Sequence, residues 1–237
     1  MTAWRLEVFN ELGSTSDFCI ECAKAGEPEG LAVQALRQTA GRGSRGRSWQ
    51  APEGNLNLSV LLRPTCPAAQ AGMFSLMAGV AVAHALEECT VPQLVLKWPN
   101  DLLLGGSKLA GILIDAAPVD NRLDWLVIGI GVNLRVAPQL EGRATTALAA
   151  HGVQVSAATA AAAVLKALSA WRDADAEAIR DAWLARAHPI GTKLEVRTAQ
   201  QHLAGTFVGL SPAGELLLQC KNRIERINTG DVLLGLA

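Results

Sequence analysis

Residues 41–49 read Gly-Arg-Gly-Ser-Arg-Gly-Arg-Ser-Trp and lie between two apolar segments, 31–36 and 56–62, that we predict to be strands. The segment matches two phosphate-binding patterns: G-x-G-x-x-G and, with Arg47 in place of the lysine, the P-loop. Both patterns need a helix directly after the glycines, because the helix N-terminus completes the anion site. Here the turn-forming residues 49–54 lead into a strand. The segment therefore predicts a strand–loop–strand unit and argues against both nucleotide-binding folds.

The loop in this unit combines flexible backbone with positive charge. Its glycines allow the chain to fold over a ligand, and Arg42, Arg45 and Arg47 can neutralise phosphate or carboxylate. We therefore expect a lid that becomes ordered over an anionic ligand. A solvated basic hairpin is the alternative that the loop by itself leaves open.

A second polar cluster begins where the predicted strand 94–98 ends. Asn100 and Asp101 follow Pro99 at this point, and Asp101 could hold a magnesium ion or a ribose, although an Asn-Asp turn cap is the plain alternative. Lys108 precedes the next apolar strand, 109–115, where its ammonium could contact a phosphate oxygen. The two clusters together indicate chemistry on a nucleotide phosphate.

Glycines recur in two of the predicted strands. Gly129 and Gly131 alternate within 125–134 and so face the same side of a sheet, and Gly111 lies in the strand 109–115. Missing side chains on one face leave a slot for a flat apolar ligand. A packing bend is the alternative explanation.

The rest of the chain predicts an α+β protein in two parts. We expect a strand at 4–9 and helices at 14–24, 68–88, 156–170 and 175–187. From residue 190 short alternating segments and turns recur, which is typical of a small β-barrel. We place the boundary so that 1–188 form a catalytic domain and 189–237 form the barrel.

The overall charge argues against a protein that coats nucleic acid. The 237 residues include 21 basic and 22 acidic residues, so the net charge is −1 and anion binding should be local. The absence of tyrosine and the presence of only four phenylalanines argue against a surface that stacks bases. We expect no nucleic-acid partner.

Three features favour a cytoplasmic protein without a membrane partner. The N-terminus lacks a basic segment followed by an apolar one, so we predict no signal peptide. The apolar helix at 68–88 gathers its bulky residues on one face, as in a buried helix. Five cysteines without framework spacing suit a reducing compartment, and we interpret Cys19 and Cys22 as free cysteines on a helix.

Four motifs, 38–43, 97–101, 108–113 and 129–133, resemble those of biotin protein ligases in order and spacing. The resemblance extends from about residue 8 to the C-terminus. It implies a mixed curved sheet flanked by helices, like the class II synthetase-like domain of the biotin and lipoate ligases, followed by an SH3-like barrel. It also implies that biotin, ATP and Mg²⁺ give biotinyl-5′-AMP. Biotin then passes to one lysine of a biotin carboxyl carrier protein, for example that of acetyl-CoA carboxylase.

The resemblance also implies roles for individual residues. Lys108 would be the main catalytic cation, with Arg42 facing the biotin carboxylate and then the adenylate phosphate. Asp101 would serve the magnesium that arrives with ATP and is the candidate base for transfer. The residues expected at biotin are Ser14, Thr15, Ser16, Gln38, Gly41, Arg42, Gly43, Ser44, Lys108, Gly111, Gly129 and Gly131. Those expected at ATP or the adenylate are Arg45, Arg47, Trp49, Asn100, Asp101, Lys108 and Asn133.

Two positions depart from the family pattern. Ser16 stands where members often have asparagine, and Ser44 stands where they commonly have another arginine. We expect the missing cation at Ser44 to weaken retention of the adenylate. The first motif begins at Ser14, so we expect a monofunctional enzyme without an N-terminal DNA-binding domain. Apolar residues in 125–134 could pair across a homodimer.

A lipoate or octanoate ligase or transferase is the nearest alternative, because it shares the fold and the acyl-adenylate chemistry. Its usual signature, Arg-Arg before a Gly-Gly-Gly segment, is absent from this chain, whereas the Trp-Pro-Asn-Asp sequence at 98–101 is present. The motifs therefore favour biotin as the substrate.

Overall fold

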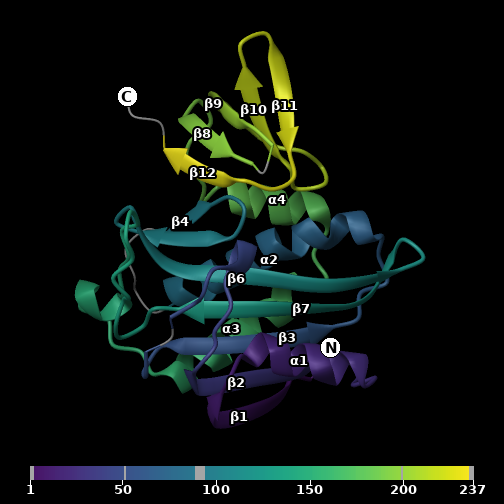
Figure 1. Ribbon diagram of the computed structural model, residues 1–237, viewed down its shortest axis with the longest axis vertical. Coiled ribbons are helices and arrows are strands. Elements are labelled where there is room, and N and C mark those ends of the chain that lie inside the picture. The colour runs from purple at the N-terminus through teal and green to yellow at the C-terminus, as the bar shows by residue number, and fades with distance from the viewer. Residues whose placement is uncertain (1–2, 51, 89–93, 199, 235–237) are drawn as a thin grey trace.

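A seven-stranded sheet forms the centre of the N-terminal part of the chain (Figure 1). The computed structural model describes residues 3–50, 52–88, 94–198 and 200–234. The strand order is β1-β2-β3-β7-β6-β5-β4; β1 and β2 are parallel and all other neighbours are antiparallel. The predicted mixed sheet is therefore confirmed. The strands are β1 (Arg5–Leu12), β2 (Leu31–Gln38), β3 (Leu56–Leu62), β4 (Leu94–Lys97), β5 (Asp101–Leu104), β6 (Ser107–Val119) and β7 (Arg122–Val132).

Helices cover both faces of this sheet. One face packs against α1 (Thr15–Lys24), and the other packs against α2 (Ala71–Glu87) and α3 (Ala157–Trp171), with α4 (Ala176–Leu184) beside α2. Alternation along the central strands sends Leu, Ile and Val side chains into the α2 side of the core. Short 3₁₀ turns occur at Ser44–Gly46, Ala68–Gln70 and Leu148–His151.

Local sequence explains where the helices begin. Ser14, Ser156 and Asp175 each cap a helix by accepting a hydrogen bond from a backbone N–H three residues on. The helix α2 is apolar on nearly every face, because the sheet, α3 and α4 surround it. Its long apolar segment, 68–87, meets the length and composition of a membrane span, but 61% of that window is buried inside the protein, as in a core helix.

The sequence patterns do not predict β5. This strand has only four residues, Asp-Leu-Leu-Leu, and short apolar segments between turns carry little periodicity. It pairs with β4, so Asn100 lies in the turn of a hairpin and Asp101 begins the returning strand. The polar pair thus lies between two strands of one edge, not beyond the end of a single strand.

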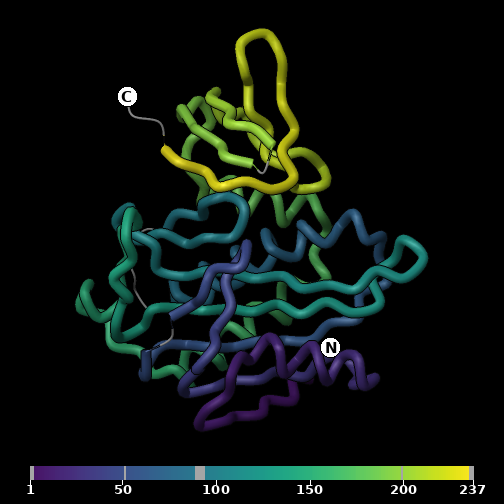
Figure 2. The backbone as a smooth tube through the Cα atoms, viewed as in Figure 1, coloured from purple at the N-terminus to yellow at the C-terminus, as the bar shows by residue number. Residues whose placement is uncertain are grey.

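The C-terminal part of the chain is a second, antiparallel sheet in the order β11-β10-β9-β8-β12. It packs above the first sheet, and the segment 41–49 crosses in front of the first sheet toward it (Figure 2). The indole N–H of Trp98 donates to the Gly214 carbonyl across this junction, at 3.1 Å. The boundary placed between 188 and 189 falls between α4 and β8 and stays a prediction. The strands are β8 (Lys193–Arg197), β9 (His202–Leu210), β10 (Leu216–Cys220), β11 (Arg223–Ile227) and β12 (Asp231–Leu234).

Candidate active site

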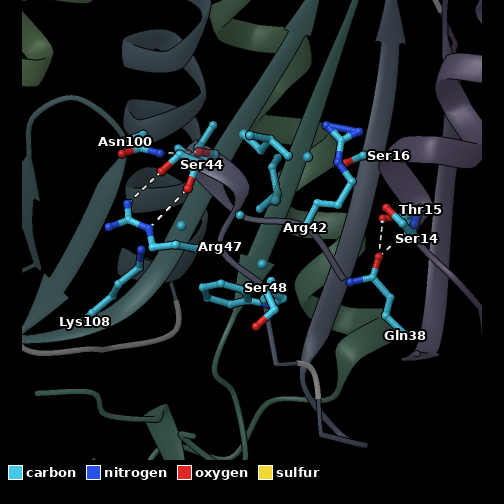
Figure 3. A pocket seen from close by; sticks show the side chains of 18 of the residues that line it. Ser14, Thr15, Ser16, Gln38, Arg42, Ser44, Arg47, Ser48, Asn100 and Lys108 are labelled. Carbon is cyan, nitrogen blue, oxygen red and sulfur yellow. Dashed lines mark hydrogen bonds between the residues drawn. The ribbon is translucent and has the colours of Figure 1, made fainter. Parts of the chain in front are cut away.

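A cavity of about 410 Å³ lies between the lid segment 41–49, the N-terminus of α1 and the faces of β6 and β7 (Figure 3). It gathers residues from four separate motifs of the sequence. The predicted site residues that line it are Ser14, Thr15, Ser16, Gln38, Arg42, Gly43, Ser44, Arg47, Trp49, Asn100, Lys108, Gly111, Gly129 and Gly131. The predicted residues outside its lining are Gly41, Arg45, Asp101 and Asn133.

Small residues on three adjacent strands form the floor of the cavity. Gly131 of β7 pairs with Asn57 of β3 on one side and with Gly111 of β6 on the other. Two residues away, Gly129 pairs with Ser59. Because residues two apart in a strand share a face, this register places the missing side chains of all three glycines together. The predicted slot is thus a property of sheet register.

The indole of Trp49 lies on this floor. A Cβ atom on Gly131 would collide with the Trp49 ring, and one on Gly111 would lie 3.2 Å from it. The Trp49 indole N–H is buried and has no hydrogen-bond partner among the described residues. The Lys108 ammonium lies 5.6 Å from the ring centroid, close enough for a cation–π contact. The lid's own aromatic side chain therefore occupies part of the slot expected for a ligand.

A chain of hydrogen bonds orients the hydroxyl groups at the α1 end of the cavity. Ser59 Oγ donates to Thr15 Oγ1 at 2.8 Å, and Thr15 Oγ1 donates to Gln38 Oε1 at 3.1 Å. The Ser59 proton is then committed, so in the 3.1 Å contact between the Ser16 and Ser59 hydroxyls Ser16 is the donor. The Ser16 oxygen keeps its acceptor capacity for an N–H group of a ligand.

Ser14 is the N-cap of α1, as predicted, and accepts from the Asp17 backbone N–H at 3.2 Å. The cap turns the chain so that residues 14–16 border the cavity. Cys19 and Cys22 are free cysteines on this helix, and burial raises the pKa of both thiols. No reactive thiolate is indicated at either position.

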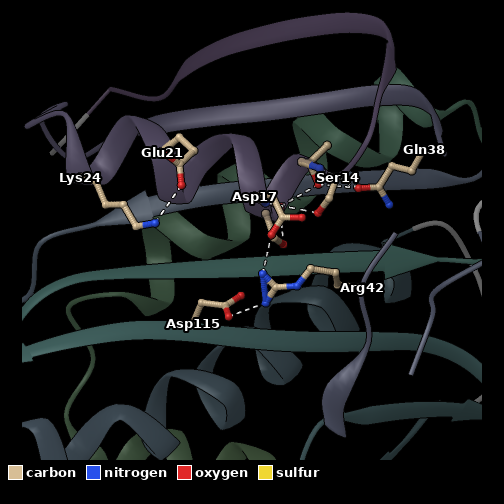
Figure 4. A network of polar contacts seen from close by, with 10 residues as sticks. Ser14, Asp17, Glu21, Lys24, Gln38, Arg42 and Asp115 are labelled. Carbon is tan, nitrogen blue, oxygen red and sulfur yellow. Dashed lines mark hydrogen bonds and ion pairs between the residues drawn. The ribbon is translucent and has the colours of Figure 1, made fainter. Parts of the chain in front are cut away.

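Arg42 is held by two carboxylates (Figure 4). Its Nη1 donates to Asp17 Oδ1 at 2.6 Å and its Nη2 to Asp115 Oδ1 at 2.5 Å. Burial raises the pKa of Asp115, and the charge of Arg42 opposes that rise. We expected Arg42 to face a ligand carboxylate; in this structure it borders the cavity while joining the lid to α1 and β6.

Lys108 and Asp101 form an ion pair at the opposite end of the cavity from Gln38. Both side chains are less than one-fifth exposed. Asn100 anchors the adjoining turn, because its Nδ2 donates to the Ile112 carbonyl at 2.6 Å. Lys97 is close by, and burial lowers its pKa, with the charge of Asp101 opposing. Two lysines and one carboxylate therefore lie close together at this end of the cavity.

Asn133 and Gly41 support the cavity from outside its lining. Asn133 is 1% exposed and its Nδ2 donates to the Thr146 carbonyl at 3.1 Å, which anchors the segment after β7. A Cβ atom on Gly41 would collide with the Trp49 carbonyl, so only glycine allows the two ends of the lid to approach so closely. Arg45 has φ +60°, lies outside the lining, and forms an ion pair with Asp231 of the C-terminal sheet.

Other lining residues escaped the sequence reasoning. Leu113 lies two residues from Gly111, so strand alternation could have placed it on the cavity face, whereas Ile112 and Ile130 belong to the core face and reach the lining as neighbours of the glycines. Ser48 lies within the lid itself. The remaining ones, Leu140, Glu141 and Arg143, come from a loop without periodicity, and no sequence signal placed that loop at the cavity.

Comparison with known proteins agrees with this geometry. The sequence model of the Biotin/lipoate A/B protein ligase family matches residues 14–133, and that of the Biotin protein ligase C terminal domain matches 191–235. The chain belongs to the biotin protein ligase family. The resemblance inferred from the four motifs is therefore confirmed, and the match at 191–235 together with the relatives below favours biotin over lipoate.

Relatives within the biotin protein ligase family match nearly the whole chain. The bifunctional ligase/repressor BirA of Bacillus subtilis is 34% identical over 94% of this chain and 72% of its own length. The biotin–[acetyl-CoA-carboxylase] ligase of Paracoccus denitrificans is 35% identical over 86% of this chain and 90% of its own. The structure of the Aquifex aeolicus biotin protein ligase in complex with biotin and ATP has a TM-score of 0.81 and 28% identity, and the match covers 98% of this chain and 99% of that one.

Proposed function

We propose that this protein activates biotin with ATP to form biotinyl-5′-AMP and then transfers biotin to a lysine of a biotin carboxyl carrier protein, such as that of acetyl-CoA carboxylase. The observation that carries the proposal is one cavity with a chain of oriented hydroxyls at one end and the cation Lys108 at the other. A ligand with a ureido head and a carboxylate tail suits these two ends.

The hydroxyl end suits the ureido group of biotin. Ser16 Oγ can accept from a ureido N–H, because its own proton is committed to Ser59. Among the described residues, Gln38 Nε2 makes one long contact, 3.5 Å to Asn57 Oδ1, so it can donate to a ureido oxygen. Ser16 could therefore take the hydrogen-bonding role of the asparagine that stands at this position in many family members.

The cationic end suits the activation step. A biotin carboxylate oxygen attacks the α-phosphorus of ATP, a bond from that phosphorus to the bridging oxygen breaks, and pyrophosphate leaves. Two negatively charged groups must approach, and a fixed cation such as Lys108 lowers the barrier by stabilising the charge of the transition state. Asp101 holds the Lys108 ammonium in place.

Magnesium is expected to enter with ATP. No cluster of three or more His, Cys, Asp or Glu side chains suited to a metal occurs in the described ranges. A single carboxylate is nevertheless enough for a magnesium ion bound mainly by phosphate oxygens and water. Asp101 would supply that carboxylate, and the bound ion would neutralise charge on the departing phosphates.

Transfer requires a neutral acceptor amine. The lysine nitrogen attacks the carbonyl carbon of the mixed anhydride, the amide forms, AMP leaves and a proton is released. Asp101, beside Lys108, is the candidate to accept that proton. Homodimer formation, a cytoplasmic location and the lack of nucleic-acid and membrane partners stay predictions from the sequence.

The first test is pyrophosphate–ATP exchange by the purified protein with magnesium, comparing biotin, lipoate and octanoate. Exchange with biotin alone is the expected result. Exchange with lipoate or octanoate instead would contradict the proposed substrate. A folded sample that exchanges with none of the three acids would contradict acyl-adenylate formation altogether.

A further inference from the structure

One carboxylate of the C-terminal sheet binds three arginines of the catalytic part. Asp231, the first residue of β12, lies 2.6 Å from Arg45 Nη1, 3.3 Å from Arg47 Nη1 and 3.8 Å from Arg143 Nη2. Arg45 and Arg47 belong to the lid, and Arg143 belongs to the loop that follows β7. The C-terminal sheet therefore contacts both loops that border the mouth of the cavity.

One lid arginine, Arg47, is held on its other side as well. Arg47 donates from Nε to the Ser44 carbonyl at 3.2 Å and from Nη2 to the Ser44 hydroxyl at 2.9 Å. Arg47 thus spans from the backbone of its own loop to Asp231. With Asp231 in place, the lid is fastened at a second point besides Arg42, which Asp17 and Asp115 hold.

The charges around Asp231 do not balance. Three guanidinium groups face one carboxylate, so this cluster carries an excess of two positive charges. Lys97 adds to this excess of positive charge. Its ammonium group interacts electrostatically with Asp231, Arg143, Lys108 and Asp101. A carboxylate that occupies an overcharged arginine cluster resembles a phosphate group in charge and in its geometry toward guanidinium.

We propose that Asp231 competes with pyrophosphate for Arg45, Arg47 and Arg143, and so promotes pyrophosphate release while keeping the lid closed over the adenylate. This proposal rests on the proposed function. When ATP binds, its β- and γ-phosphates take the arginines from Asp231. After adenylate formation Asp231 takes them back, which displaces pyrophosphate and fastens the lid over the product that must stay.

The variant Asp231→Asn separates this role from a merely structural one. It keeps the shape of the side chain and removes the charge that competes. Because Asp231 and the arginines are about one-third exposed, solvent screens the effect. We expect the Asp231→Asn protein to bind pyrophosphate about three- to tenfold more tightly than the native protein, as measured by calorimetry. We also expect it to release bound biotinyl-5′-AMP several-fold faster, as measured by chasing labelled adenylate with an unlabelled excess. Asp231→Glu should restore both values.

Asp124→Asn is the matched control, because Asp124 also pairs with an arginine, Arg63, but lies outside the cavity lining. It should leave both values unchanged. Weaker or unchanged pyrophosphate binding by Asp231→Asn would overturn the proposal, as would a failure of both proteins to bind pyrophosphate. Unchanged adenylate dissociation would overturn the lid part.

Limited digestion with trypsin gives a readout that needs no activity. The unliganded Asp231→Asn protein should be cleaved faster than the native protein after Arg45 and Arg47, and pyrophosphate should protect both. Equal cleavage rates would show that Asp231 does not fasten the lid. Since calorimetry and digestion use no biotin, they test this proposal even if the exchange assay contradicts the proposed substrate.

Discussion

Individual side chains in the cavity are fixed in direction by neighbours that do not contact the ligand space. Ser59 sets the proton direction of the Ser16 hydroxyl, and Asp101 holds the ammonium of Lys108. Such preset donors, acceptors and charges reduce the reorganisation that a reaction requires. The consequences can be tested one side chain at a time.

Lys108→Ala should fold normally and barely form the adenylate. Removing a fixed cation from the transition state typically costs about 10²–10³ in rate. Biotin-dependent pyrophosphate–ATP exchange measures the loss, and circular dichroism checks the fold. Lys166→Ala, which removes an exposed lysine on α3, should keep native activity. An equally fast Lys108→Ala enzyme would remove this lysine from the mechanism.

Ser44→Arg should slow the escape of biotinyl-5′-AMP. The new guanidinium adds a cation where we expect the adenylate phosphate to lie, although the substitution also removes the hydroxyl that accepts from Arg47. The adenylate dissociation rate of the variant should fall below that of the native protein. Ser44→Ala, which removes the hydroxyl without adding charge, should not slow dissociation. Equal rates for native and Ser44→Arg proteins would contradict the expectation.

At the scale of secondary structure, the register of β3, β7 and β6 makes the slot. Alternate residues of β7 divide between the apolar core on the α2 side and the cavity on the other. The core side carries Ile128, Ile130 and Val132, and the cavity side carries Gly129 and Gly131. A one-residue shift would exchange the two sets.

Gly131→Ala should weaken biotin binding. The added methyl group protrudes into the slot, where it would collide with the Trp49 ring and would equally crowd a ligand that takes the place of that ring. Overpacking costs about 1–3 kcal/mol, or roughly tenfold or more in affinity. Calorimetry with biotin measures the effect. Gly72→Ala, which places a methyl group in open space on α2, should bind biotin like the native protein. Native affinity for Gly131→Ala would show that the slot does not hold biotin.

At the scale of the whole molecule, the C-terminal sheet closes one side of the catalytic part. The contact includes the bond from Trp98 to Gly214 and the ion pairs of Asp231. His188 lies at the same junction, and its Nε2 is buried without a partner among the described residues. Burial, and then the charge of Lys97, lower the pKa of His188.

His188 should make the protein less stable in mild acid. An unfolded histidine has a pKa of about 6.5, so below that pH the unfolded chain gains a proton that folded His188 resists. The free energy of unfolding should therefore fall as pH drops from about 6.5 toward the lowered pKa of the folded state. In His188→Gln this dependence should shrink. Denaturant unfolding at about pH 7.5 and pH 5.5 measures the free energy of unfolding at each pH. An equal decrease between the two pH values in the native and His188→Gln proteins would contradict this prediction.

Much of the fold and part of the site were predictable from local signals. Side-chain caps marked the starts of α1 and α3, and apolar runs marked β2, β3 and α2, because these signals act over a few residues. The strand β5 was missed because four residues carry no reliable period. The loop containing Leu140, Glu141 and Arg143 was missed because its position depends on distant contacts.

The sequence by itself determined the chemistry available to this protein: the glycines, the lid arginines, Lys108 and the motifs that indicate its family. Only the tertiary structure decided which charges meet. Arg42 pairs with Asp17 and Asp115, which lie 25 and 73 residues away in the sequence. The lid arginines pair with Asp231, which lies 184 or more residues away. Periodicity and capping act locally, whereas an ion pair depends on where the packed sheets place two side chains.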